Sequence, residues 1–195
     1  MRKTLVLLAA VLVLQPACRK KQSPPDVAQL IAEVHSADVQ KRGKARMALI
    51  ALGEEAAPAL AVMLRSPDPA ERHLAVNILW GMGARARAAV PELAAALDST
   101  DAELQRAAAM ALEAVGPGAE AAVPALVRAL GERRDRRVRQ AAAKALGAIG
   151  PGAGAALPVL TRELRRESWP EAEEAVRSIR GLEPGAPVDL GEPAR

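Results

Sequence analysis

One frame of residues recurs four times along this chain, and no other feature limits the possible folds as strongly. In each copy an Asp is followed seven residues later by an Ala, then at intervals of four by a Leu and a Gly. The copies begin at Asp38, Asp68, Asp101 and Asp135, and the prolines that follow their glycines are spaced 33, 33 and 34 residues apart. A fixed period of this size is typical of solenoids built from two-helix units.

The composition also favours stacked helices. The chain has no Phe and no Tyr, and Trp80 and Trp169 are its only large rings, so Ala, Leu and Val must fill the core. Small Ala side chains let neighbouring helices approach closely. The net charge is +4, and removal of Arg2 and Lys3 with the leader lowers it to +2. Such a small excess of positive charge does not by itself indicate nucleic-acid binding.

The first 17 residues have the pattern of a signal peptide. Arg2 and Lys3 precede an unbroken apolar run over residues 5–14. A membrane-spanning helix needs about 20 apolar residues, so this run is too short to be an anchor. We therefore predict that residues 1–17 direct export.

Cys18 is the only cysteine and follows Ala17 directly, so it cannot form an internal disulfide. Its position resembles the lipobox of bacterial lipoproteins, which implies that Cys18 begins the mature chain and carries lipid. Gln15 stands where that family usually has Leu, and ordinary cleavage after Ala17 is the alternative. In Gram-negative lipoproteins an Asp after the Cys signals inner-membrane retention. Arg19 stands there instead, which implies the outer membrane facing the periplasm, with residues 18–25 as a polar tether.

Each copy of the frame predicts two helices. The Asp is a helix N-cap, apolar residues follow at helical spacing, and the Gly suits an αL position at the C-terminus. A short Gly/Ala turn should follow, and the second helix should begin near the proline. Each second helix should bury a pair of leucines: Leu60 and Leu64, Leu93 and Leu97, Leu126 and Leu130, Leu160 and Leu164.

Partial units flank the four copies. Residues 26–35 are expected to form a lone second helix and residues 168–182 a lone first helix, because solenoid ends need an altered outer face. The repeat domain is thus predicted over residues 26–182. Residues 183–195 contain three prolines and two glycines without periodicity, and we expect a disordered tail.

The fourth copy, residues 135–160, reads DRRVRQAAAKALGAIG and then ALPVL after a short turn. It resembles a HEAT repeat, most closely the subclass similar to phycobilisome lyase HEAT-like repeats. The resemblance covers residues 26–182 and implies an all-α, right-handed α-solenoid of about five two-helix repeats. In that family an Arg after the Val often pairs with an Asp of a neighbouring repeat. Arg42, Arg72 and Arg139 hold this position here, and Gln105 interrupts the series.

Residues suited to catalysis are scarce. His35 and His73 are the only histidines and neither has a Glu beside it, whereas a metal site needs three or four convergent ligands. Gly116 and Gly118 flank a proline in a turn and do not form a phosphate loop. We predict no enzymatic activity, no cofactor, no small-molecule substrate and no nucleic-acid ligand. Resemblance alone keeps bilin lyases and alkylpurine glycosylases as alternatives, and export argues against both.

A group of arginines is the candidate partner-binding site. In one interpretation it is a patch that binds an acidic protein, a lipid phosphate or lipopolysaccharide. In the other it is only a solvated turn with the helix surface beside it. Its members are Arg128, Arg133, Arg134, Arg136, Arg137, Arg162 and Arg166.

The two tryptophans have different expected roles. Trp80 holds a frame position that varies between copies, so it is either an exposed anchor or a cover for a neighbouring helix. Trp169 precedes a proline at a predicted helix start, and we expect it to cap the fourth repeat.

Together these observations predict a protein-binding scaffold held at the cell envelope by the lipid on Cys18. The second helices are expected to line the inner, concave side, with Arg128, Arg162 and Arg166 on their outward surface, and the first helices to form the outer side. A structural envelope protein without a partner groove is the alternative.

Overall fold

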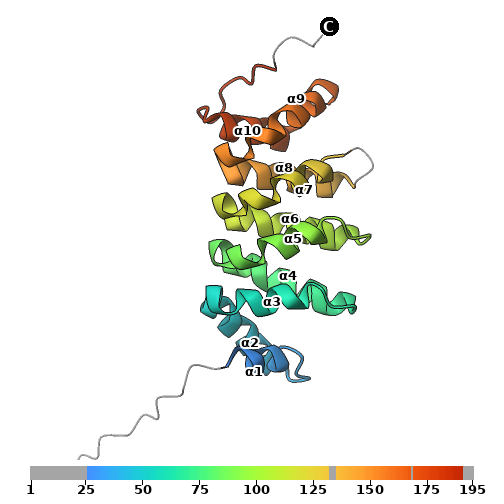
Figure 1. The fold of residues 1–195 in the computed structure, drawn as a ribbon, viewed down its shortest axis with the longest axis vertical. Helices are drawn as coiled ribbons and strands as arrows, with labels where there is room; N and C mark the ends of the chain where they lie inside the picture. Colours follow the sequence, from blue (N-terminus) through green and yellow to red (C-terminus); the bar gives the residue numbers. More distant parts are fainter. Residues whose placement is uncertain (1–25, 132–134, 168, 191–195) are drawn as a thin grey trace, which may run out of the picture.

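The computed structural model describes residues 26–131, 135–167 and 169–190. These residues form an α-solenoid of stacked helical pairs without a β-strand (Figure 1). The predicted signal peptide, Cys18 and the predicted tether lie outside the described ranges. A lone helix α1 (Val27–Glu33) begins the stack and a lone helix α10 (Pro170–Arg180) ends it. Between them are the pairs α2 (Val39–Leu52) and α3 (Ala57–Met63), α4 (Pro69–Met82) and α5 (Val90–Ala96), α6 (Ala102–Val115) and α7 (Val123–Ala129), and α8 (Arg136–Ile149) and α9 (Leu157–Arg166).

The aspartates of the repeated frame cap the first helices as predicted. Asp38 Oδ1 accepts a hydrogen bond from the Gln40 N–H at 2.8 Å, and Asp135 Oδ1 accepts one from the Arg137 N–H at 2.7 Å. Each such bond satisfies a backbone donor that the first turn of a helix leaves without a partner. Asp26 caps the lone helix α1 in the same way.

The frame glycines end these helices with a conformation that differs from the prediction. Gly53, Gly83, Gly116 and Gly150 have φ between 58° and 72°, but their ψ values of −116° to −140° lie outside the αL region. Side chains with a Cβ rarely adopt this conformation, so glycine is required at these positions. The chain then continues into 3₁₀ helices in place of the expected open turn: η1 (Gly53–Glu55), η2 (Gly83–Ala89), η3 (Gly116–Ala122) and η4 (Gly150–Ala156).

Two continuous stretches, Ala102–Ala129 and Arg136–Arg166, are long and apolar enough by composition to cross a membrane. Each changes direction at Gly116 or Gly150 and contains a first helix, a 3₁₀ segment and a second helix. Their large apolar residues belong to the shared core of the stack or pack against it.

The core lies between two layers of helices. All of the predicted leucine pairs of the second helices are buried, and so are Leu112 and Leu146 at matching positions of the first helices. Neighbouring first helices form the most extensive contacts in the molecule, from α4 through α6 and α8 to α10. Fully buried alanines such as Ala108 and Ala142 permit this close approach. The second helices α5 and α7 contact each other at only a few points.

The C-terminal end differs from the expected disordered tail over residues 183–190. This segment has no regular structure, yet Val188 and Leu190 pack against the core. The Arg177 Nε donates to the Ala186 carbonyl at 2.8 Å, and the Arg180 Nη1 donates to the Asp189 carbonyl at 2.6 Å. Satisfied carbonyls and partly buried apolar side chains hold the segment on the last repeat, and residues 191–195 lie outside the described ranges.

Trp169 supports the same end of the stack. Its ring is buried, and the Arg139 guanidinium of α8 lies 5.4 Å from the ring centroid, within cation–π range. This placement agrees with the predicted cap over the fourth repeat.

Candidate protein-binding surface

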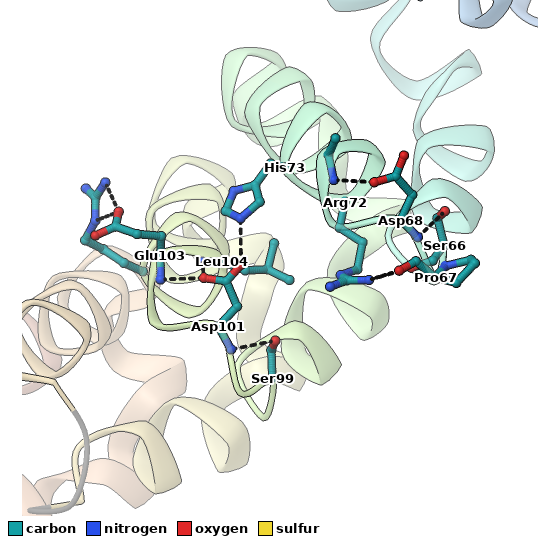
Figure 2. A network of polar contacts seen from close by, with 11 residues as sticks. Ser66, Pro67, Asp68, Arg72, His73, Ser99, Asp101, Glu103 and Leu104 are labelled. Atoms are coloured by element: carbon teal, nitrogen blue, oxygen red, sulfur yellow. Dashed lines mark hydrogen bonds and ion pairs between the residues drawn. The ribbon is translucent and has the colours of Figure 1, made fainter.

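The turns between repeats are stabilised by a recurring hydrogen-bond network (Figure 2). The Ser66 Oγ accepts the Asp68 N–H at 3.2 Å, and Asp68 in turn caps α4. The Arg72 Nη1 donates to the carbonyls of Ser66 and Pro67 at 2.8 and 3.0 Å. The frame Arg therefore closes the turn that precedes its own helix. Among the described residues it does not pair with an Asp of a neighbouring repeat, in contrast to what the family resemblance implied.

The same arrangement holds in the neighbouring repeats. Arg42 donates to the carbonyls of Ser36 and Ala37, and Gln105 donates to the carbonyl of Ser99. Gln105 thus replaces Arg in the same role, since its amide also reaches the turn carbonyl. At the fourth repeat Arg133 stands where the other turns have Ser, and residues 132–134 lie outside the described ranges.

His73 has a structural partner that the sequence interpretation missed. Its Nε2 lies 2.7 Å from Asp101 Oδ2, which joins α4 to the N-cap of α6 (Figure 2). The hydrogen bond from His73, aided by the backbone N–H of Leu104, lowers the pKa of Asp101 below its usual value of 3.8. His73 thus lies on the helix surface, about one third exposed, and also links two repeats. Among the described residues, no group of three His, Cys, Asp or Glu is arranged to hold a metal ion.

The predicted arginine site is divided between different parts of the surface. Arg128 pairs with Asp98 at 2.8 Å, Arg136 with Glu167 at 3.9 Å, and Arg162 with the adjacent Glu163 at 3.3 Å. Three members meet at one place: Arg166 lines a polar cavity beside Trp169, and Glu167 and Glu163, the partners of Arg136 and Arg162, line the same cavity. Arg137 lines a different groove on the first helices, and Arg133 and Arg134 lie outside the described ranges.

The two layers also differ in packing. The first helices α4, α6, α8 and α10 contact one another more extensively than the shorter second helices do. The assignment of the second helices to the inner, concave side stays a prediction.

The first-helix face is the surface formed by the exposed side chains of α2, α4, α6, α8 and α10. It carries large apolar side chains on successive helices. Met47 on α2 is 65% exposed, Trp80 on α4 is 48% exposed, and Met110 on α6 is partly exposed. Trp80 is therefore exposed, whereas its role as an anchor for a partner stays a prediction. Exposed apolar groups on a shared face are characteristic of protein interaction surfaces.

Two adjoining cavities continue this face across α6, α8 and α10. Their volumes are about 280 and 590 Å³, and they share Glu113, Lys144 and Glu171. The smaller one also reaches Arg106, Met110 and Arg137, and the larger one reaches Gly147, Glu174, Ala175 and Ser178. Sequence reasoning missed these cavities. Their residues hold outward frame positions that vary between copies, and that variation was the one available signal.

The fold agrees with the comparisons with known proteins. The family profile for HEAT repeats matches residues 56–132 and 90–180, which together cover more than half of the chain. The chain therefore belongs to the HEAT-repeat family. No curated protein matches it.

Solved structures with the same architecture include natural and designed repeat proteins. The complex of CpcE and CpcF of phycocyanin lyase from Nostoc sp. PCC7120 matches at 25% identity and a TM-score of 0.57, over 87% of this chain and 69% of that one. An engineered protein matches at 25% identity and a TM-score of 0.57, over 80% of this chain and 79% of that one. A computationally designed armadillo repeat protein for modular peptide recognition matches at 18% identity and a TM-score of 0.58, over 81% of this chain and 84% of that one.

Proposed function

We propose that this HEAT-repeat protein is a non-catalytic scaffold that binds a protein partner along the first-helix face. The observation that carries the proposal is the exposed series of Met47, Trp80 and Met110, which leads into the two cavities over α6, α8 and α10. Apolar side chains grouped on one exposed face mark interaction sites, and Trp is enriched among residues that dominate binding energy.

The related structures support a binding role. The designed armadillo protein was made for modular peptide recognition, and CpcE and CpcF form a complex with each other. A stack of helical pairs thus offers a long surface to a protein or an extended peptide. Because one of these structures belongs to a phycocyanin lyase, a catalytic role is the competing proposal.

The cellular location belongs to the same proposal. Residues 1–17 export the chain, and the lipid on Cys18 holds it at the outer membrane facing the periplasm, with residues 18–25 as the tether. The apolar run, the sole cysteine and Arg19 after it support this location.

Site-specific crosslinking in intact membranes tests the binding surface. A photocrosslinking residue at Trp80 probes the first-helix face, and the same residue at Val62, which is 68% exposed on α3, is the matched control on the second-helix layer. We expect one stoichiometric protein adduct from position 80 and none from position 62. Adducts of equal yield at both positions, or at neither, would support the structural role without a partner groove.

The anchor has a separate test. Replacing Cys18 with Ala, or adding globomycin, should leave an unprocessed precursor or release the protein from membranes. If the Cys18→Ala protein is processed and remains in the membrane fraction, lipidation at Cys18 is wrong and cleavage after Ala17 becomes the better assignment.

A further inference from the structure

We infer that the larger cavity, between α8 and α10, receives a basic side chain from an extended segment of the partner. This inference rests on the proposed function, since it specifies the chemistry of a partner bound to the first-helix face. It depends on a buried carboxylate oxygen without a partner, on the charge balance of the lining residues and on the shape of the cavity floor.

The buried oxygen belongs to Glu171, in the first turn of α10. Its Oε1 accepts a hydrogen bond from the Gln140 Nε2 at 3.3 Å, whereas its Oε2 is buried without a hydrogen-bond partner in the described structure. A buried acceptor without a donor has lost its hydrogen bonds to water without a replacement, and this loss is more costly when the acceptor carries charge. Glu171 lines both cavities, so a donor from a ligand in the groove lies beside this carboxylate. The Oε2 itself is covered in this conformation, and a bond to it requires the side chain to turn toward the groove.

The charge of the cavity selects a cation. Glu113, Glu171 and Glu174 line it, and Lys144 is the basic residue among its lining groups. Glu174 receives a hydrogen bond from the Arg177 Nη1 at 3.1 Å, while Glu113 forms no ion pair within the described ranges. The lining of the larger cavity therefore keeps an excess of negative charge, which favours an ammonium or guanidinium group over an anion there. Arg106 and Arg137 add positive charge only to the adjoining smaller cavity.

The floor of the cavity suits the aliphatic part of a long basic side chain. Gly147, Ala148 and Ala175 line it and present only small groups. α8 and α10 approach so closely here that a Cβ on Gly147 would lie 3.2 Å from the Ala175 Cα. Lys and Arg bury their methylene stems on apolar surface while the charged end meets polar groups. A volume of about 590 Å³ leaves room for such a side chain.

A titration with a defined probe tests the inference without the natural partner. The probe is N-acetyl-arginine methylamide, and its neutral isostere is N-acetyl-citrulline methylamide. The isotope-labelled mature chain is used with its lipid in detergent, and methyl NMR signals of Ala148 and Ala175 report on the cavity. We expect saturable shifts with the arginine probe, at least tenfold weaker binding of the citrulline probe, and weaker arginine binding as salt rises.

The substitution Glu171→Gln should weaken binding of the arginine probe about tenfold. The control Glu54→Gln removes an exposed charge in η1, far along the chain from the cavity, and should leave binding unchanged. Circular dichroism and thermal melting of both variants must match wild type. Equal binding of both probes, or equal loss in both variants, would overturn the inference.

The partner experiment separates this inference from the proposed function. In one outcome, position 80 still crosslinks one partner while Glu171→Gln changes neither the yield of that adduct nor the affinity for the arginine probe. That result would exclude a basic side chain in the cavity and leave the scaffold role in place. If position 80 gives no adduct, the scaffold role fails, and the probe titration still decides whether the cavity binds a cationic side chain.

Discussion

The two helix layers of this solenoid are built in different ways. Complete first helices such as α6 and α8 are 14 residues long, and alanines at their interfaces let them form one continuous packed layer. The second helices α3, α5 and α7 are seven residues long and direct their leucines into the core. Their mutual contacts are few, and exposed ion pairs such as Arg128–Asp98 connect successive second-layer segments.

Because of this difference, the two layers should contribute unequally to the stability of the fold. Exposed ion pairs contribute little, because water and salt screen them and ordered side chains lose entropy. Close packing of small and large apolar groups carries most of the stabilisation. The first layer therefore determines the spacing of the repeats, and substitutions there should have larger effects than substitutions on the outer side of the second layer.

The largest effect is expected for Leu112→Ala in α6. Leu112 is fully buried, and truncation of a buried Leu costs about 2–5 kcal/mol through lost burial and a cavity. Because each repeat contacts only its neighbours, hydrogen exchange should show protection lost first over residues 101–130. Val62→Ala on the exposed side of α3 is the control and should change stability little. Uniform loss over residues 26–182 would indicate a single cooperative globule.

Gly116→Ala should come next, with a loss of about 1–3 kcal/mol, because φ of 68° with ψ of −136° strains a residue with a Cβ. Gly154→Ala is the matched control, since nothing lies within 4 Å of the added Cβ and its φ is ordinary. Urea unfolding measures both. Equal losses at the two positions would show that the conformation at the end of α6 is not the cause.

The link between His73 and Asp101 should have a smaller, pH-dependent effect of about 0.5–1.5 kcal/mol. The pKa of Asp101 is lowered in the folded state, so its stabilising contribution is present above the unfolded value near 3.8 and is lost as pH falls through the folded value. Asp101→Asn keeps a capping side chain but removes the charge. Its destabilisation, measured by urea unfolding, should be larger at pH 7 than at pH 3.

A double-mutant cycle isolates this contact from the helix cap. His73→Ala and Asp101→Asn should be less than additive at pH 7, because each removes the same interaction. Strict additivity would mean that the pH dependence arises elsewhere.

The smallest effect is expected for Arg128→Ala in the second layer. Its ion pair with Asp98 is exposed, so we expect a loss of about 0.2–1 kcal/mol that decreases at high salt. Thermal unfolding at two salt concentrations measures it. A loss as large as that of Leu112→Ala would contradict the proposed difference between the layers.

The local structure of each repeat could be predicted from the sequence. Asp38 and Asp101 begin helices, Pro91 and Pro124 lie in the first turn of second helices, and Leu93 and Leu126 are buried, all as the repeated frame indicated. Capping, helical periodicity and proline geometry act within a few residues, and four agreeing copies make the pattern clear.

Only the tertiary structure showed how the repeats meet. Side-chain geometry across turns or between repeats determines the turn partners of Arg72, the bond from His73 to Asp101 and the burial of the Glu171 Oε2. The extensive contacts within the first layer depend on it as well. The docking of residues 183–190 on α9 and α10 likewise has no periodic signal. Sequence periodicity predicts which side of a helix faces inward. The grooves and hydrogen bonds between helices are determined by interhelical spacing, which depends on how small side chains from different repeats pack together.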